Sequence, residues 1–486
     1  MTDANKTDGA RPVHIVFVGA GAVGCFYASR LHHPARNIHT SLIARSNYAT
    51  LREHGVSLKT HSFGDYTFAP ASVFPSPSAA AAAPHAWDFV VVTTKALPDR
   101  SDDAALIAPL VTEGTTTILL IQNGVGVEAP YRARFPSTPI VSGVTVISAE
   151  QISPGTVRQN RWTRIHLGPY SHSADPDSAE SRVDAELEKR GREKANQIGD
   201  WWARLGGIRD VEVEDELDLQ LIRWHKLTIN AAFNPSAVLS GGRPNADMVG
   251  DQELRAHLKG VMEEIWEAVP RVLGGRRFPA ELASPERILK STERNVGGRP
   301  SMLVDWEAGR PMELEVILGN PVRIARGRGV SLGRMQGMYA LLRSMQEMRE
   351  RERKGRGDGK FLLLSSVVLV GQVSTLDGLG RSILPKGGGL TALRIMKLIE
   401  EVQIFFFFFF PDICIWGRCM ILDRFSAGSV GAMSYLPTFA ELEICQEDSN
   451  LFCLRQAIIM CGKMAVTLGL CVFKLGLCIH ISMLKI

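Results

Sequence analysis

Short apolar segments alternate with helix-like segments over the first third of the chain. A helix pattern spans residues 22–32, and strand patterns occur at 13–19 (VHIVFVG), 40–45 (TSLIAR), 87–96 (WDFVVVTTKA), 115–124 (TTTILLIQNG) and from 139 onward (PIVSGVTVIS). Nearly continuous apolar strands that alternate with helices are typical of a parallel sheet covered on both faces. The pattern therefore predicts an α/β fold.

The pattern changes after about residue 150. A Pro-Gly turn separates two strand-like runs in residues 152–168, which predicts a hairpin. Residues 171–196 are highly charged and are expected to form a surface insertion that leads into a helix. Long helical patterns then continue to about residue 350, so the second domain should be mainly α-helical. Between the early strands, the Pro/Ser/Ala stretch 75–86 reads as an exposed loop.

Residues 361–486 differ from the rest of the chain. They hold six consecutive phenylalanines (405–410) and seven of the eight cysteines, with no steady periodicity. We interpret this atypical tail as disordered, or as the product of a faulty gene model, and expect no packed element over the phenylalanine run. A membrane segment at 464–486 is the alternative, because that stretch has about the length of a span. The predicted domains are then 13–215, 216–350 and the tail.

Charge and cysteine content narrow the function classes. The net charge is +4 over 486 residues and no basic block with interleaved aromatics stands out, so nucleic-acid binding is not indicated, whereas a small anionic ligand is compatible. The N-terminus lacks the basic and apolar segments of a secretory signal, and Cys25 is the only cysteine before residue 414. We expect residues 1–360 to form a reduced cytoplasmic protein without a membrane partner, and we assign no metal ligands.

The motif GAGAVG lies where the first strand meets the first helix. It comprises Gly19, Ala20, Gly21, Ala22, Val23 and Gly24. The first glycine permits a tight turn, the second lets a pyrophosphate approach the backbone, and the third lets helix and strand pack closely. The helix N-terminus offers unpaired N–H groups to an anion. Strand, glycines, helix and second strand follow in the required order, which predicts a Rossmann-type dinucleotide-binding domain rather than a glycine-rich turn alone.

Cofactor choice depends on the end of the second strand. An acidic residue there would bind the ribose hydroxyl of NAD, but this chain has Arg45, which favours NADPH; an ordinary surface arginine is the alternative. Lys95 follows the third strand and Asn123 the fourth, at the sheet edge where such folds bind ligands. Turn chemistry could also account for both, since Asn-Gly is a common turn pair.

The helical segment RWHKLTINAAFNPSAVLSG (223–241) carries Lys226, Asn230 and Asn234 at four-residue spacing, so the three share one face. By spacing alone, this is more often a solvated stripe. After a dinucleotide domain, however, a lysine partly desolvated in a cleft is a candidate proton donor for a carbonyl that is being reduced.

A second segment, residues 299–330, could supply the opposite wall of the cleft. Ser301 precedes an apolar helical start, and a Gly-Arg-Pro turn leads into a helix whose first turn should hold Glu313 and Glu315. Acidic residues in a first turn usually interact with the helix dipole. We assign that role to Glu315 and expect Glu313 to face the cleft.

Together these motifs resemble those of the ketopantoate reductase (2-dehydropantoate 2-reductase) family over residues 13–348. The resemblance rests on GAGAVG, Lys95-Ala96, the QNG of 122–124, the lysine–asparagine helix with Asn234-Pro235, and SML-x-D followed by GR-x-x-E over 301–313. The family's fold is an N-terminal Rossmann-type domain followed by a mainly α-helical C-terminal domain.

The resemblance implies reduction of 2-dehydropantoate to pantoate by NADPH, for coenzyme A synthesis. It makes Lys226 the general acid and gives Glu313 a role in orienting the substrate. Substrate contacts are implied for Asn123, Asn230, Asn234, Asn245 and Ser301. Cofactor contacts are implied for the GAGAVG residues, Arg45, Lys95, Asn123 and Glu313. A homodimer is compatible with this reading.

Several departures from the family pattern leave alternatives open. The usual NGE is NAD here, with Ala246 after Asn245; Met312 stands where Thr is common, and Gly333 where Pro is usual. A reductase of another 2-keto acid and a non-catalytic NADPH-binding protein are the two alternatives. Loss of the lysine or the glutamate would mark the latter, and both are present.

Overall fold

The computed structural model describes residues 11–172, 184–357, 402–410, 413–421 and 438–446. The chain divides into two compact units, Met1–Lys360 and Phe361–Ile486. The first unit holds every residue for which the sequence predicts a function.

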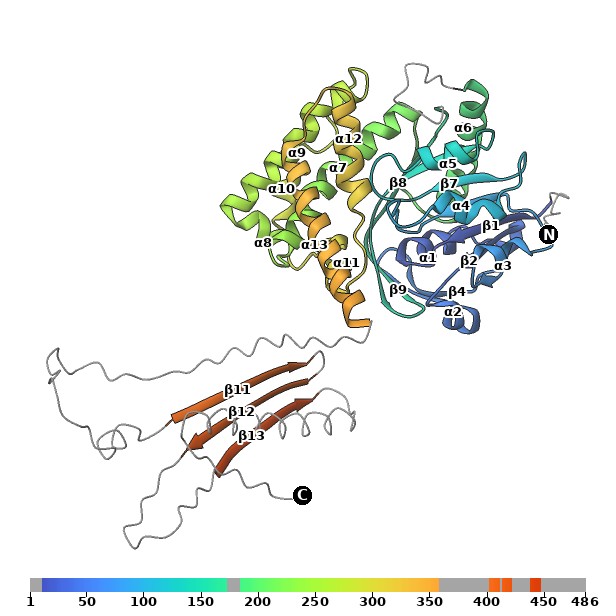
Figure 1. Cartoon of the computed structure of the whole chain (residues 1–486). Coiled ribbons are helices and arrows are strands. Elements are labelled where there is room, and N and C mark those ends of the chain that lie inside the picture. Colours follow the sequence, from blue (N-terminus) through green and yellow to red (C-terminus); the bar gives the residue numbers. More distant parts are fainter. Residues whose placement is uncertain (1–10, 173–183, 358–401, 411–412, 422–437, 447–486) are drawn as a thin grey trace, which may run out of the picture. The chain divides into compact units, whose positions relative to one another are not determined.

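A ten-stranded sheet forms the N-terminal part of the first unit (Figure 1). Its order is β4-β3-β9-β8-β7-β6-β1-β2-β5, with β10 beside β9. The six strands from β8 to β5 in this order are parallel, whereas β3–β4 and β8–β9 are antiparallel pairs. The strands are β1 (Val13–Val18), β2 (Ile38–Ile43), β3 (Val56–Thr60), β4 (Gly64–Phe68), β5 (Val73–Phe74), β6 (Phe89–Val92), β7 (Thr117–Leu120), β8 (Ile140–Ser153), β9 (Thr156–Pro169) and β10 (Val211–Val213). The predicted α/β fold is confirmed, and β8 and β9 form the hairpin expected over 152–168.

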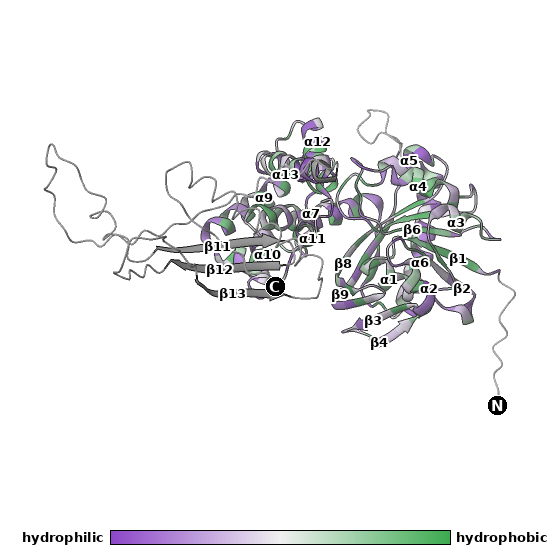
Figure 2. Cartoon of the chain, turned by 60° about the horizontal axis from the view of Figure 1, so that its bottom comes forward, coloured by the Kyte–Doolittle hydropathy of each residue, from purple (hydrophilic) through white to green (hydrophobic). Residues whose placement is uncertain are grey.

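Both faces of the central strands are buried. Along β1, Ile15 and Phe17 enter one apolar cluster while Val16 and Val18 enter another, as the two-residue period of a strand requires. Figure 2 shows hydrophobic colour along these central strands. The surrounding helices are α1 (Ala22–Ser29), α2 (Tyr48–His54), α3 (Pro77–Ala81), α4 (Asp103–Ile107), α5 (Ala129–Arg134) and α6 (Ala185–Asp200). Two short 3₁₀-helices, η1 (Pro34–Arg36) and η2 (Ala108–Leu110), and the π-helical η3 (Trp201–Leu205) accompany them.

The stretch 75–86 is not simply a loop, contrary to the prediction. It contains α3, in which Ser76 caps the helix by accepting a hydrogen bond from the backbone N–H of Ala79 at 3.1 Å. Pro77 occupies the first helical position, where its missing N–H is not needed, and alanines follow. A stretch rich in Pro, Ser and Ala can therefore look like low-complexity sequence and still favour a short helix.

The C-terminal part of the first unit is helical, as predicted. One apolar cluster joins its helices and also includes Ala96 and Val125 from the sheet domain. The elements are α7 (Glu216–Leu239), α8 (Asn245–Gly250), α9 (Gln252–Val272), α10 (Pro285–Thr292), α11 (Ser301–Glu307), the π-helical η4 (Glu315–Gly319), α12 (Asn320–Gly327) and α13 (Gly333–Gly357).

Helix α7 begins with strong local signals. The Asp215 side chain accepts a hydrogen bond from the backbone N–H of Asp218 at 2.8 Å, and Glu216 adds a second acidic group to the first turn. Asp215 satisfies a free N–H donor of the helix, and both carboxylates interact favourably with the positive end of the helix dipole. The cap fixes where α7 starts, and thereby where its lysine lies along the helix axis.

In the second unit the described residues form an antiparallel three-stranded sheet of β11 (Val402–Phe410), β12 (Ile413–Ile421) and β13 (Thr438–Gln446). The phenylalanine run lies in β11, whose backbone pairs with that of β12, and aromatic residues favour strands. The expectation of no packed element there stays a prediction. The alternative of a membrane segment at 464–486 falls outside the described residues. Within the part of the chain that the structure describes, no helix combines the length and apolar character of a membrane span.

Candidate active site

Three loops meet at the carboxyl edge of the central strands. Gly19 follows β1, Lys95 follows β6 and Asn123 follows β7. Strands β1, β6 and β7 are adjacent and parallel, so their C-terminal ends lie at one edge. This is the edge at which open α/β sheets bind ligands.

The glycine loop has the shape of a phosphate-binding turn. Gly19 has a positive φ of 111°, and a Cβ atom there would lie 2.9 Å from the backbone N of Thr94. A Cβ atom on Gly24 would lie 2.1 Å from the carbonyl oxygen of Gly19, whereas one on Gly21 would meet nothing within 4 Å. Gly24 therefore serves helix packing, and the space at Gly21 is open.

The start of α1 completes this cradle. Gly21 is its N-cap and provides no side-chain acceptor, so the first N–H groups of the helix, at Ala22 and Val23, stay available to an anion. The described residues at this position therefore fit the pyrophosphate of a dinucleotide.

The predicted lysine contacts the sheet domain directly. The Nζ atom of Lys226 donates to the Oδ1 atom of Asn123 at 2.8 Å. On its other side, the Nδ2 atom of Asn123 makes a long, 3.5 Å hydrogen bond to the Oε2 atom of Glu313. The Oε1 atom of Glu313 accepts from the backbone N–H of Ala96 at 3.2 Å. An amide thus links an ammonium group to a carboxylate.

Burial makes Lys226 an unusually acidic lysine. Desolvation is the largest cause, the charge of Arg223 adds to it, and Glu313 opposes it; the pKa of Lys226 is lowered to about 8. An amine with this pKa is still mostly protonated at neutral pH, yet it gives up its proton more readily than an ordinary lysine.

Burial acts in the opposite direction on Glu313, which is 6% exposed. Desolvation raises the pKa of its carboxyl, while the charge of Lys95 and the hydrogen bonds from Ala96 and Asn123 partly oppose the rise. The prediction that Glu313 lies in the first turn of a helix was wrong, because η4 begins at Glu315. The preceding irregular segment lets Glu313 turn toward the sheet domain, while Glu315 accepts hydrogen bonds from Arg323 and Tyr339.

Lys95 has a buried partner in the helical domain. Asp305 of α11 is 3% exposed and forms ion pairs with Lys95 and, at 3.0 Å, with Arg310. Sequence reasoning included Asp305 in a motif but gave it no role. The signal was present, since an aspartate amid the apolar residues of SMLVDW needs a cationic partner when it is buried.

Two family models match this chain. Ketopantoate reductase PanE/ApbA matches residues 15–172, and Ketopantoate reductase PanE/ApbA C terminal matches residues 218–346, so that together they cover more than half of the chain. The chain belongs to the ketopantoate reductase family. It is therefore an oxidoreductase of the ketopantoate reductase type, a family that uses a nicotinamide cofactor on a Rossmann-type fold.

Individual relatives cover the first unit. An uncharacterized protein of Saccharomyces cerevisiae is 30% identical over an alignment of 362 positions, which covers 70% of this chain and 95% of that protein. The 2-dehydropantoate 2-reductase of a Nostoc species is 25% identical and aligns over 67% of this chain and 93% of its own length. The crystal structure of 2-dehydropantoate 2-reductase from Methylococcus capsulatus matches with a TM-score of 0.57 and 29% identity, covering 69% of this chain and 98% of that one.

The remaining predicted substrate residues of this ketopantoate reductase family member lie in the helical domain. Asn230 is half-buried and Asn234 is buried, on successive turns of α7 after Lys226. Asn245 begins α8; its backbone N–H donates to the carbonyl of Gly298, and its side-chain Oδ1 is buried without a hydrogen-bond partner. Ser301 is exposed at the first position of α11. Of these, only Asn245 has a buried acceptor left open for a ligand.

Arg45 is exposed two residues beyond β2, which is the neighbour of β1. It makes no contact with Lys226 or Glu313, and none is expected if it binds the adenosine end of the cofactor, remote from the nicotinamide. Its position at the carboxyl edge is compatible with a contact to a ribose phosphate.

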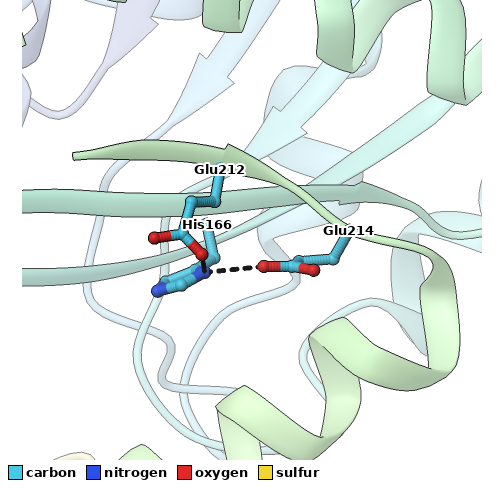
Figure 3. A group of neighbouring side chains, drawn as sticks. All are labelled: His166, Glu212 and Glu214. Atoms are coloured by element: carbon cyan, nitrogen blue, oxygen red, sulfur yellow. Dashed lines mark hydrogen bonds and ion pairs between the residues drawn. The ribbon is translucent and has the colours of Figure 1, made fainter. Parts of the chain in front are cut away.

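A separate group of titratable side chains lies on β9, on β10 and directly after β10. Figure 3 shows His166 facing Glu212 and Glu214; its Nδ1 atom is 3.0 Å from Glu214 and 3.6 Å from Glu212. Among the described residues this is the one cluster whose spacing could hold a metal ion. A histidine between two carboxylates is also an ordinary ion-pair arrangement, so the cluster by itself does not indicate a metal.

Proposed function

We propose that this protein reduces 2-dehydropantoate to (R)-pantoate with NADPH, in the cytoplasm, as a step of pantothenate and coenzyme A synthesis. The observation that carries the proposal is the hydrogen-bonded series Lys226–Asn123–Glu313 at the carboxyl edge, beside the glycine cradle. The 2-dehydropantoate 2-reductases among its relatives support the substrate. A homodimer is part of the same hypothesis.

The cofactor would lie with its pyrophosphate over Gly21 and the start of α1, where the structure leaves open space. Arg45 would contact the 2′-phosphate of NADPH, and Lys95 and Asn123 would lie toward the nicotinamide. When bound, NADPH supplies the hydride that reduces the ketone.

Lys226 would act as the general acid. Reduction of a ketone develops negative charge on its oxygen, and a proton donor in hydrogen-bond reach stabilises that charge. A pKa of about 8 keeps Lys226 protonated at neutral pH while bringing its acidity close to the working pH, which favours proton transfer. Asn123 would keep the ammonium group aimed at the substrate.

Glu313 and the asparagines would orient the substrate. The carboxylate of Glu313 is fixed by Ala96 and Asn123, so it can accept a hydrogen bond from a substrate hydroxyl in a defined direction. The unpartnered Oδ1 atom of Asn245 is a second acceptor of this kind. Asn230, Asn234 and Ser301 remain proposed substrate contacts through the family resemblance.

The departure at Met312 does not alter this proposal. Met312 is fully buried, and its backbone N–H donates to the side-chain oxygen of Gln346 at 2.8 Å. It therefore faces the helical core rather than a substrate. The alternative of a different 2-keto acid rests on the other departures.

The direct test is a steady-state assay of the full chain with NADPH and a panel of 2-keto acids. The proposal predicts the highest kcat/KM for 2-dehydropantoate. A higher kcat/KM for another keto acid would support the alternative reductase, and NADPH binding without turnover of any of them would support the non-catalytic alternative.

A further inference from the structure

A buried arginine lies one helical turn before the proposed acid. Arg223 of α7 is 3% exposed and precedes Lys226 by three residues. We infer that Arg223 is a positioning residue, which fixes the loop that carries Asn123 and thereby holds Lys226 in place. This inference rests on the proposed function. The sequence pattern gave no role to Arg223, the first residue of the lysine–asparagine segment.

The guanidinium group holds both sides of Asn123. Its Nη1 atom donates to the carbonyl oxygen of Gln122 at 3.1 Å and to that of Gly124 at 3.0 Å. These two carbonyls flank the residue whose side chain accepts from Lys226. The two hydrogen bonds hold the backbone on either side of Asn123 and thereby limit where its Oδ1 atom can point.

The other nitrogens of Arg223 anchor it to the sheet domain. Its Nε atom lies 3.0 Å from the Oε1 atom of Glu128, which is also buried. Its Nη2 atom donates to the hydroxyl of Ser142, which in turn donates to Glu128 at 2.7 Å. Gln220, one turn earlier on α7, donates to Glu128 as well. The planar fork of an arginine can make these contacts together, whereas a lysine cannot.

Arg223 also acts on Lys226 through its charge. Two charged groups are the main electrostatic influences on the lysine: Arg223 from its own helix lowers its pKa, and Glu313 from the segment before η4 raises it. Asn123, from the loop after β7, contributes a neutral amide. Removing the charge of Arg223 should therefore raise the pKa of Lys226.

A double-mutant cycle tests the positioning role. Arg223→Lys, Asn123→Ala and the double variant are prepared in the full chain, and kcat and KM are measured with NADPH and 2-dehydropantoate. Arg223→Lys alone should lower kcat by about 10- to 100-fold, the cost of a displacement near 1 Å, with a smaller change in KM. In the Asn123→Ala background the same substitution should have little further effect, because the residue it positions is absent. Equal loss of kcat in both backgrounds would overturn the inference.

Arg132 supplies a matched control. It is equally buried, at 3% exposed, and its guanidinium likewise donates to backbone carbonyls, those of Phe135, Pro136, Thr138 and Tyr170. Arg132→Lys should lower the melting temperature without lowering kcat. A kcat loss as large as that of Arg223→Lys would show that replacing any buried arginine lowers kcat through destabilisation, and would contradict a special positioning role for Arg223. If Arg223→Lys does not fold, Ser142→Ala takes its place, because it removes one contact of the same guanidinium.

A second readout does not need turnover. Competitive acetylation of the full chain across pH, followed by peptide mass spectrometry, reports the pKa of Lys226. Arg223→Met combined with Glu128→Gln, which leaves no unpaired buried charge, should raise that pKa above the wild-type value, whereas Arg132→Met should not. An unchanged pKa would contradict the inference. If the wild-type chain reduces no keto acid, the proposed function fails, and this readout still decides whether Arg223 controls Lys226.

Discussion

The ammonium group of Lys226 donates to the amide oxygen of Asn123 at 2.8 Å, although the two residues are 103 positions apart in the sequence. This bond joins the helix α7 to the loop after β7, and so joins the helical domain to the nucleotide edge of the sheet. The proposed acid is consequently positioned by the domain that would bind the cofactor.

The pH dependence of turnover should report the lysine. A general acid works in its protonated form, and the pKa of Lys226 is lowered to about 8. We therefore expect kcat to be level near neutral pH and to fall as the pH rises through about 8. Stopped-flow rates of NADPH oxidation from about pH 6 to pH 10 would measure this profile. A profile that stays flat to the alkaline end would count against an amine acid.

Glu313→Gln should lower kcat and move this profile. The glutamine amide keeps an acceptor for Ala96 but loses the charge that raises the pKa of Lys226. We expect a kcat loss of about 10²-fold or more and an alkaline limb shifted to lower pH. Glu315→Gln is the control, because Glu315 contacts Arg323 and Tyr339 instead of the site. If both variants gave the same profile, Glu313 would have no special role.

Two glycines of the cofactor loop should respond differently to alanine. At Gly24 the added Cβ would lie 2.1 Å from the carbonyl of Gly19, so Gly24→Ala should lower the melting temperature of the free protein. At Gly21 nothing lies within 4 Å, so Gly21→Ala should fold normally and bind NADPH more weakly. Thermal melts and fluorescence titrations with NADPH would separate the effects. Unchanged NADPH affinity in Gly21→Ala would remove the proposed pyrophosphate position.

Arg45 should determine the choice between the two nicotinamide cofactors. Its guanidinium is exposed beyond β2 and would pair with a 2′-phosphate that only NADPH carries. Arg45→Ala should therefore weaken NADPH binding much more than NADH binding in calorimetric titrations. Arg36, exposed before β2 at the opposite edge of the sheet, provides the control. Equal weakening of both cofactors by Arg45→Ala would leave no basis for NADPH preference.

Local patterns account for most of what the sequence predicts correctly. The strand–glycine–helix series is contiguous, so its spacing alone indicates the nucleotide loop. The helix α3 was missed because a run of Pro, Ser and Ala reads as low complexity, although Ser76 and Pro77 are also good helix-start residues.

Contacts between distant segments could not be derived from periodicity. The approach of Glu313 to Ala96 spans 217 positions; the segment around Glu313 indicated that it faces a cleft, but no spacing could name Ala96 as its partner. The Arg223–Glu128 pair was overlooked because the two residues lie in separate segments of the chain, and no local pattern links the helix that begins before Arg223 to the loop that holds Glu128. Only the structure shows that both side chains are buried and paired, as buried charges must be to avoid a high cost.

The most direct test of the account is the turnover of Lys226→Ala. Single-turnover reduction of 2-dehydropantoate by NADPH should slow by about two to four orders of magnitude, while NADPH affinity measured by fluorescence stays at the wild-type level. Near-normal turnover in this variant would contradict the central claim that Lys226 is the proton donor.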